Sequence, residues 1–253
     1  MKIKKLEKKK CGKYEITLEN NIKIKTYDDV ILNNNILYNK DLDYETINQI
    51  NSESYYYDIY NKIVKMISTK LRCEQEIKVF LDKSDLSKKD KDKMIDALKQ
   101  NGLVNDENFV KAYIHDKICF SNYGPLKIKG ELEKLGVDID IINKYVDEID
   151  DNVFVEKKKN YVLKKINSNH KHSKTMLVQK IKNELYLMGY DNINIDAYMK
   201  DDSDILEKEI SKEYKKLALK YTNEEVKNKI YRKFYQKGFS RENIMKCLEN
   251  LDI

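Results

Sequence analysis

Proline and glycine are scarce in this chain, which has one proline and seven glycines among 253 residues. Sandwiches and barrels use both residues freely in their many turns, so this scarcity argues against an all-β domain. No stretch approaches the roughly 18 consecutive apolar residues of a membrane span, and the N-terminus lacks the apolar core of a signal peptide. We therefore expect a cytoplasmic protein without a membrane partner.

Clusters that would carry catalysis or bind metal are also missing. The cysteines form no C-x-x-C pair, which argues against a zinc site or a disulfide framework; they are Cys11, Cys73, Cys119 and Cys247. His170 and His172 have few other ligand types beside them, and Asp201-Asp202-x-Asp204 lacks the glycine and glutamate of a calcium loop. No nucleophile arrangement or Gly-rich phosphate loop occurs. We expect no enzymatic activity, metal or cofactor, and we predict that Asp204 is a helix N-cap.

Charge, by contrast, is abundant and unevenly distributed. The 49 basic residues outnumber the 43 acidic ones by six, yet only three of the 49 are arginines. Bidentate readout of bases or phosphates is therefore not favoured. Nine lysines and no carboxylate lie between Lys157 and Asn183, directly after an acidic run over residues 138–151. This separation predicts a molecule with faces of opposite charge, although a solvated lysine face is the simpler interpretation.

The first 50 residues differ in pattern from the rest. Polar and apolar residues alternate over Tyr14–Leu18 and again over 22–25, with a turn sequence at Glu19-Asn20-Asn21. We predict two or three short antiparallel strands, followed by a short helix capped by Asp28. A second helix should begin near Tyr44, capped by Asp43.

A repeated helical unit occupies the remainder of the chain. Its clearest copy is residues 123–136, where Pro125 suits a first helical turn and Gly136 suits a left-handed C-terminal cap. The apolar positions and the glycine recur after shifts of 53 and 49 residues, as Ile128, Leu132 and Gly136, then Ile181, Leu185 and Gly189, then Ile230, Phe234 and Gly238. A second apolar face follows each glycine, and a weaker copy precedes the three. Such periodicity is typical of stacked supersecondary units.

Each unit has room for three helices, the first of which we place at Ser54–Ser68, Asp106–Phe120, Val153–Asn167 and Asp204–Tyr221. The predicted fold is mainly α: tandem three-helix, bundle-like repeats in an elongated array behind a small N-terminal β-containing region. The predicted divisions are residues 1–51, 52–104, 105–151, 152–202 and 203–253.

Several stretches resemble the RecX family, the bacterial regulators of the RecA recombinase. They are Leu98-Lys-Gln-Asn-Gly-Leu-Val-Asn-Asp-Glu-Asn-Phe-Val-Lys-Ala-Tyr, Tyr123-Gly-Pro-Leu-Lys-Ile-Lys-Gly-Glu-Leu, Leu135-Gly-Val, and upstream Arg72-Cys-Glu-Gln-Glu-Ile. The similarity is strongest over residues 72–150, and the β-like N-terminus resembles that of the longer, Gram-positive members. Val110 departs from the usual alanine, and Leu126-Lys127 has one charge fewer than the family's basic pair.

The resemblance implies a non-enzymatic regulatory protein, monomeric and cytoplasmic, that takes part in DNA repair, recombination and the SOS response. RecX-like proteins bind the groove of the RecA–single-strand DNA filament and hinder its recombinase, ATPase and coprotease activities. DNA, single- or double-stranded, is a further possible contact. The alternative is a helical-repeat protein that binds nucleic acid directly through lysine-rich faces, without a filament partner.

Basic residues are the candidates for contact with a filament or DNA. They lie in the acid-free segment and in a possible stripe across repeats, where solvated side chains are the plainer interpretation; they are Lys127, Lys129, Lys157, Lys158, Lys164, Lys165, Lys171, Lys174, Lys180, Lys182, Arg232 and Lys233. The 19 tyrosines could stack on bases, but we assign them mainly to the core and its rim.

Overall fold

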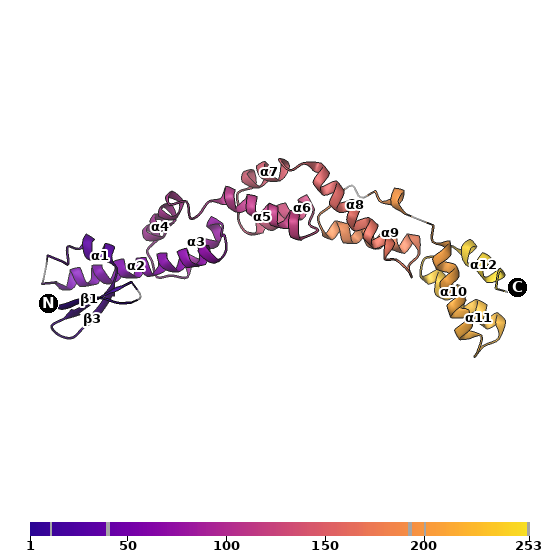
Figure 1. Cartoon of the computed structure of the whole chain (residues 1–253), viewed down its shortest axis with the longest axis horizontal. Coiled ribbons are helices and arrows are strands. Elements are labelled where there is room, and N and C mark those ends of the chain that lie inside the picture. Colours follow the sequence, from indigo (N-terminus) through magenta and orange to yellow (C-terminus); the bar gives the residue numbers. More distant parts are fainter. Residues whose placement is uncertain (11, 39–40, 192–193, 200, 252–253) are drawn as a thin grey trace. The chain divides into compact units, whose positions relative to one another are not determined.

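The computed structural model describes residues 1–10, 12–38, 41–191, 194–199 and 201–251. Within these ranges helices dominate, and one small sheet lies at the N-terminal end of the chain (Figure 1). The chain forms two compact units. The first holds Met1–Phe109 and Leu135–Val137, and the second holds Val110–Lys134 and Asp138–Ile253. The predicted mainly α class with a small N-terminal β region is confirmed.

The N-terminal sheet contains three antiparallel strands in sequential order, β1 (Ile3–Lys8), β2 (Tyr14–Leu18) and β3 (Lys23–Thr26). The predicted turn between β2 and β3 is present, with Asn21 at a φ of 63°. The alternating apolar side chains Ile16, Leu18 and Ile24 are buried, because that face of the sheet packs on the helices that follow.

Those helices are α1 (Asp28–Asn33) and α2 (Tyr44–Thr69). Asp43 caps α2 as predicted, accepting from the backbone N–H of Thr46 at 2.7 Å. Asp28 does not cap α1; it is the first helical residue, and Tyr27 holds the cap position without a side-chain bond. The predicted boundary at residues 51/52 falls inside α2, so the N-terminal region and the first repeat share one helix.

The first repeat adds α3 (Glu74–Asp82) and α4 (Lys88–Gln100) to the second half of α2. Its core is formed by one buried face from each helix, including Ile63, Ile77, Leu81 and Met94. The amphipathic pattern that the sequence shows in this weaker copy is therefore sufficient to build the unit.

Repeats two to four follow the same plan. Their elements are α5 (Asp106–Phe120), α6 (Pro125–Lys134), α7 (Ile139–Asp147), α8 (Asp151–Asn167), α9 (Lys174–Leu187), the 3₁₀ helix η1 (Asp196–Tyr198), α10 (Ser203–Leu217), α11 (Asn223–Gln236) and α12 (Arg241–Glu249). The apolar positions of each second helix are fully buried, as the repeat predicted: Ile128 and Leu132, Ile181 and Leu185, Ile230 and Phe234. Gly136, Gly189 and Gly238 all have φ between 78° and 81°, which confirms the left-handed caps.

The third helix predicted for the third repeat is wrong. Within 194–199 and 201–202 the structure has only η1, although Ile195 is buried like its counterparts. The sequence over residues 191–196 is rich in Asn and Asp, whose side chains compete with the backbone hydrogen bonds of a helix. Asp204 is also not the N-cap of α10; the cap position belongs to Asp202.

A recurring joint connects the second helices of successive repeats. The turn after one second helix contacts the N-terminus of the preceding second helix, where backbone N–H groups lack partners within their own helix. Leu135 O accepts from the Cys73 thiol at 3.4 Å, Met188 O accepts from Gly124 N at 2.6 Å, and Lys237 O accepts from the Ser173 hydroxyl at 2.8 Å. We call these three contacts the joints.

An acidic side chain completes two of the joints. The first helical N–H of α3, at Glu74, donates to Asp106 Oδ1 at 2.8 Å, and that of α9, at Lys174, donates to Asp202 Oδ2 at 2.6 Å. In the middle joint this position is Pro125, which has no N–H to satisfy. At the N-terminus of α11, the N–H and the hydroxyl of the N-cap residue Thr222 both donate to Glu225 Oε2 at 3.0 Å.

Candidate functional site

The acid-free lysine segment of the third repeat occupies α8, α9 and the loop between them. Lys164, Lys171, Lys174 and Lys180 are exposed, whereas Lys158 and Lys182 are half-buried. None of these six ammonium groups makes an ion pair with a residue that the structure describes, so their charge remains available. We call the four exposed residues the repeat-3 lysine surface.

Lys157 belongs to the same segment but has a structural role. Its Nζ lies half-buried at the C-terminal end of α5, where it donates to the carbonyl oxygens of Ile118 and Ser121. A cation at this end also interacts favourably with the helix dipole. Burial lowers the pKa of the Lys157 ammonium. Its contacts are with the fold, which makes it a poor candidate for binding a partner.

Four other candidate residues are engaged within their own repeats. Lys129 binds Asp147 and Asn143, each at 2.8 Å, and the ammonium of Lys127 lies 4.1 Å from the ring centre of Tyr123. Lys165 pairs with Glu184 at 2.9 Å and Lys233 pairs with Glu213 at 2.7 Å. Arg232 is exposed. Of the candidates for the stripe, Lys129 and Lys233 therefore already link two helices, whereas Arg232 does not among the described residues.

One of these links recurs between the first and second helices, which sequence reasoning missed. Glu131 accepts from the hydroxyl of Tyr113 and lies 3.4 Å from Lys117 Nζ. In the third repeat Tyr161 and Lys165 take the same roles toward Glu184, with the tyrosine hydroxyl at 2.8 Å. In the fourth repeat the signs are reversed, as the Glu213–Lys233 pair. The sequence contains the signal in the second and third repeats, where a tyrosine and a lysine stand four residues apart and a glutamate occupies the same place in α6 and α9.

Burial acts to raise the pKa of Glu184, but hydrogen bonds from Lys165 and Tyr161 outweigh it, and the net pKa is lowered. The same balance lowers the pKa of Glu131, where Tyr113 and Lys117 are the donors. Both glutamates are therefore held ionised, and each neutralises a lysine that would otherwise add to the basic surface.

A cavity of about 280 Å³ opens beside the loop between α8 and α9. It is lined by Lys165, Ser168, Asn169, His170, Lys171, His172, Leu177, Lys180 and Ile181. The side chain of Asn169 holds the loop, donating to His172 O at 2.8 Å and accepting from His172 N at 3.0 Å. Lysine and histidine side chains line this cavity and no carboxylate does, which suits an anionic group such as a phosphate.

The remaining chemistry-bearing residues form no such centre. Cys11 lies outside the described residues, and Cys73, Cys119 and Cys247 are free thiols. Among the described residues no group of three or more His, Cys, Asp or Glu side chains could hold a metal. None of the described helices combines the length and the apolar character that a membrane crossing needs.

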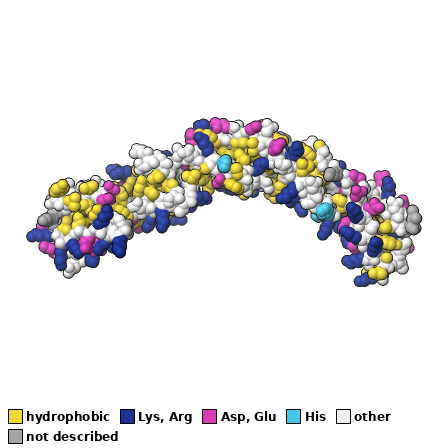
Figure 2. All heavy atoms as spheres, viewed as in Figure 1, with side chains coloured by type: hydrophobic (Ala, Val, Ile, Leu, Met, Phe, Trp, Pro, Cys, Tyr) yellow, Lys and Arg dark blue, Asp and Glu magenta, His cyan; other side chains and the backbone are white. Residues whose placement is uncertain are grey.

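Most of the tyrosines pack as rim residues, as expected, but the pair on α11 is more open. The rings of Tyr231 and Tyr235 stack at 5.8 Å, and Tyr235 is 57% exposed. Figure 2 shows that hydrophobic side chains reach the surface between lysines and arginines on the visible face.

Comparison with known proteins finds similarity to one family of regulatory proteins. The family model described as RecX, second three-helix domain, matches residues 105–145, which contain α5, α6 and most of α7. The regulatory protein RecX of Listeria welshimeri is 27% identical over 98% of this chain and 95% of its own length. That of Streptococcus agalactiae is 28% identical over 98% of each chain.

Two solved structures share the fold. A crystal structure of a regulatory protein RecX aligns with a TM-score of 0.64 at 21% identity, covering 75% of this chain and 94% of that one. The crystal structure of RecX from Lactobacillus salivarius aligns with a TM-score of 0.51 at 27% identity, covering 55% of this chain and 90% of that one.

Proposed function

We propose that this chain, which belongs to the RecX family of regulatory proteins, binds the RecA–single-strand DNA filament and modulates it in DNA repair and recombination. The expected effect is mostly inhibition of the recombinase, ATPase and coprotease activities. It acts as a monomer in the cytoplasm, by binding and without catalysis. The observation that carries the proposal is similarity to regulatory relatives over 98% of the chain.

The repeat-3 lysine surface is the part of the molecule that we assign to the filament. Its four exposed ammonium groups are not engaged in ion pairs within the described residues. A nucleoprotein filament exposes phosphates and carboxylates, which attract such groups over roughly 10 Å at moderate salt. Lys157 and Lys165, in contrast, are held by contacts within the fold.

The test follows ATP hydrolysis by RecA on single-stranded DNA while the protein is titrated. We expect hydrolysis to change in a saturable way. The variant with Lys164, Lys171, Lys174 and Lys180 changed to Glu should need a several-fold higher concentration for the same effect. A matched control changes the four exposed lysines Lys83, Lys88, Lys89 and Lys93 of the first repeat to Glu.

The two variants carry the same change of net charge, so they separate a local contact from the general charge of the chain. If both lose activity equally, the repeat-3 lysine surface is not the contact. If saturating wild-type protein leaves ATP hydrolysis unaltered, the filament proposal itself is refuted.

Direct binding to nucleic acid is the second candidate, and the basic cavity beside Asn169 favours it. It predicts that single-stranded DNA alone binds the protein, with an affinity that falls steeply as salt rises. Fluorescence anisotropy of a labelled oligonucleotide without RecA measures this. Inhibition of the filament in the absence of such binding would leave the filament as the sole partner.

A further inference from the structure

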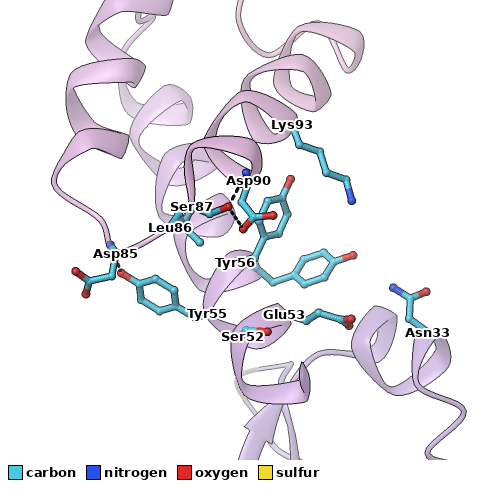
Figure 3. A pocket seen from close by; sticks show the side chains of 11 residues that line it. Asn33, Ser52, Glu53, Tyr55, Tyr56, Asp85, Leu86, Ser87, Asp90 and Lys93 are labelled. Atoms are coloured by element: carbon cyan, nitrogen blue, oxygen red, sulfur yellow. Dashed lines mark hydrogen bonds between the residues drawn. The ribbon is translucent and has the colours of Figure 1, made fainter. Parts of the chain in front are cut away.

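A second cavity, of about 290 Å³, lies in the first unit between α2 and the segment that leads into α4. Figure 3 shows lining side chains from α2 and from the start of α4, with Asn33 of α1 to one side, while the Asp85 carboxylate points away from Tyr55. It is lined by Asn33, Ser52, Glu53, Tyr55, Tyr56, Tyr57, Asp85, Leu86, Ser87, Asp90 and Lys93. Its volume lies at the lower end of the range of ligand pockets, which is roughly 300 to 1,000 Å³, and is large enough for one side chain.

Tyrosine rings form the apolar part of the cavity. Tyr56 and Tyr57 meet edge to face, with ring centres 5.7 Å apart, and both are half-buried. The hydroxyl of Tyr55 accepts from Asp85 N at 3.3 Å, which ties the α3–α4 segment to α2. The ring–ring contact and this hydrogen bond therefore hold the tyrosines that line the cavity in place.

Carboxylates give the cavity a negative charge, although the whole chain carries +6. Glu53, Asp85 and Asp90 line it together with a single cation, Lys93. None of the three carboxylates makes an ion pair with a described residue. Among the described residues, Glu53 accepts hydrogen bonds from the neutral amides of Gln49 and Asn34.

The carboxylates act on the same rings that line the cavity. Burial raises the pKa of Tyr56, and the charges of Tyr57 and Asp90 raise it further. Burial also raises the pKa of Tyr57, with Asp29 and Glu53 adding to it. Negative charge and aromatic faces thus meet in one small volume. A cation placed there would gain from both, through cation–π attraction and charge-assisted hydrogen bonds.

We propose that this cavity binds a basic side chain of a protein partner, with arginine preferred. A planar guanidinium can lie against a tyrosine ring while its N–H groups donate to Glu53 and Asp90, which the compact, strongly hydrated lysine ammonium does less well. Three carboxylates disfavour a phosphate, so a nucleic acid is not the occupant. The proposal is independent of the filament function, because it concerns a different surface.

The experiment titrates the full-length ¹⁵N-labelled protein with the capped tripeptide acetyl-Gly-Arg-Gly-amide and follows amide chemical shifts. Residues 53–57 and 85–93 should shift in a saturable way. The same tripeptide with citrulline, which has the shape of arginine without its charge, serves as the probe control. It should bind far more weakly.

The paired variants are Glu53→Gln with Asp90→Asn, and, as a matched control, Glu133→Gln with Glu249→Gln. Both remove two negative charges, and the control residues are exposed glutamates in other repeats. The first variant should weaken arginine binding by roughly tenfold, equivalent to about 1.4 kcal/mol, whereas the control should not. Because Asp90 interacts with the α4 N-cap Ser87, a thermal melt by circular dichroism accompanies each variant, and Glu53→Gln alone should give part of the loss.

Three results would overturn the proposal. The citrulline peptide could bind as well as the arginine peptide, the shifts could spread over all acidic surfaces, or the control variant could lose as much affinity as the cavity variant. Each would show general attraction to the protein instead of a defined site.

Discussion

Glycines with positive φ offer a graded test at the scale of single residues. A Cβ at Gly102 would meet nothing within 4 Å, one at Gly136 would lie 2.6 Å from the flexible Gln75 side chain, and one at Gly189 would lie 2.2 Å from the backbone nitrogen of Lys127. Gly102→Ala should cost about 1 kcal/mol for the left-handed backbone alone. Gly136→Ala should cost slightly more, and Gly189→Ala should exceed Gly102→Ala by about 2 kcal/mol because backbone must move.

Urea unfolding of the three variants measures the order. Equal losses in all three would mean that only φ matters and that the joint at Gly189 tolerates displacement. A larger loss at Gly102 than at Gly189 would contradict the close contact with Lys127.

Asp106 lets the pH dependence of a joint be predicted. Burial raises the pKa of its carboxyl group, although the bond from Glu74 N opposes this. The folded chain therefore holds this proton more tightly than the unfolded chain, so the stability that the protonated group contributes is full below the unfolded pKa and is lost as pH rises from there through the folded pKa. Asp106→Asn keeps an oxygen acceptor for Glu74 N–H. Its stability relative to wild type should increase as pH rises from about 3 to about 7. Thermal melts across that range measure this, and a difference in melting temperature that does not change with pH would contradict the raised pKa of Asp106.

The link between first and second helices allows a test at the scale of elements. The fourth repeat shows that the pair can be reversed, since Glu213 there faces Lys233. Glu184→Lys alone should destabilise the third repeat by about 1 kcal/mol, because it places two lysines together and strands the Tyr161 hydroxyl. Adding Lys165→Glu should recover about half of that loss. A double-mutant cycle from urea unfolding measures the coupling between residues 165 and 184. Strictly additive losses would mean that the pair contributes no interaction energy.

Local sequence accounts for most elements, and its failures have a physical pattern. The helix from Pro125 to Lys134 could be predicted because its start, apolar face and end are set by neighbouring residues. The helix expected around Ile195 failed because its buried isoleucine satisfies the apolar pattern without a regular helix. The single helix α2 was split in prediction because its two halves bury different cores, one against the sheet and one in the first repeat.

The candidate site was predictable only in part for the same reason. The runs of charge in the sequence show where lysines are concentrated, and they were sufficient to predict the exposed lysines of the acid-free segment. Whether one lysine is free depends on contacts far away in the chain: Lys157 is taken up by carbonyls 36 and 39 residues earlier. The joints are similarly invisible in a local pattern, because their partners are separated by 62 to 64 residues.

At the scale of the whole molecule, the joints should govern how far unfolding is cooperative. Between the third and fourth repeats the coupling rests on Ser173, which donates to Lys237 O, and on Asp202, which accepts from Lys174 N. Ser173→Ala with Asp202→Ala should lower the stability by about 2 kcal/mol through lost caps. It should also separate the melting of the fourth repeat from the rest.

Hydrogen exchange resolved by peptide measures this separation, with α10–α12 exchanging before α5–α7 in the variant. Glu249→Gln, far from the joint residues in sequence, is the control and should leave the exchange order unchanged. Uniform loss of protection along the chain would show that the joint does not set the boundary of a cooperative unit.

The joints also have a consequence for the order in which the chain can be completed on the ribosome. Synthesis runs from the N-terminus, yet the start of the second helix in each of the first three repeats contacts a turn 62 to 64 residues further on. A nascent repeat must therefore wait for the next one to emerge before its own second helix is finished. A capping box, by contrast, forms as soon as its own turn is made, as with Cys73 and Glu76 in α3 and with Thr222 and Glu225 in α11.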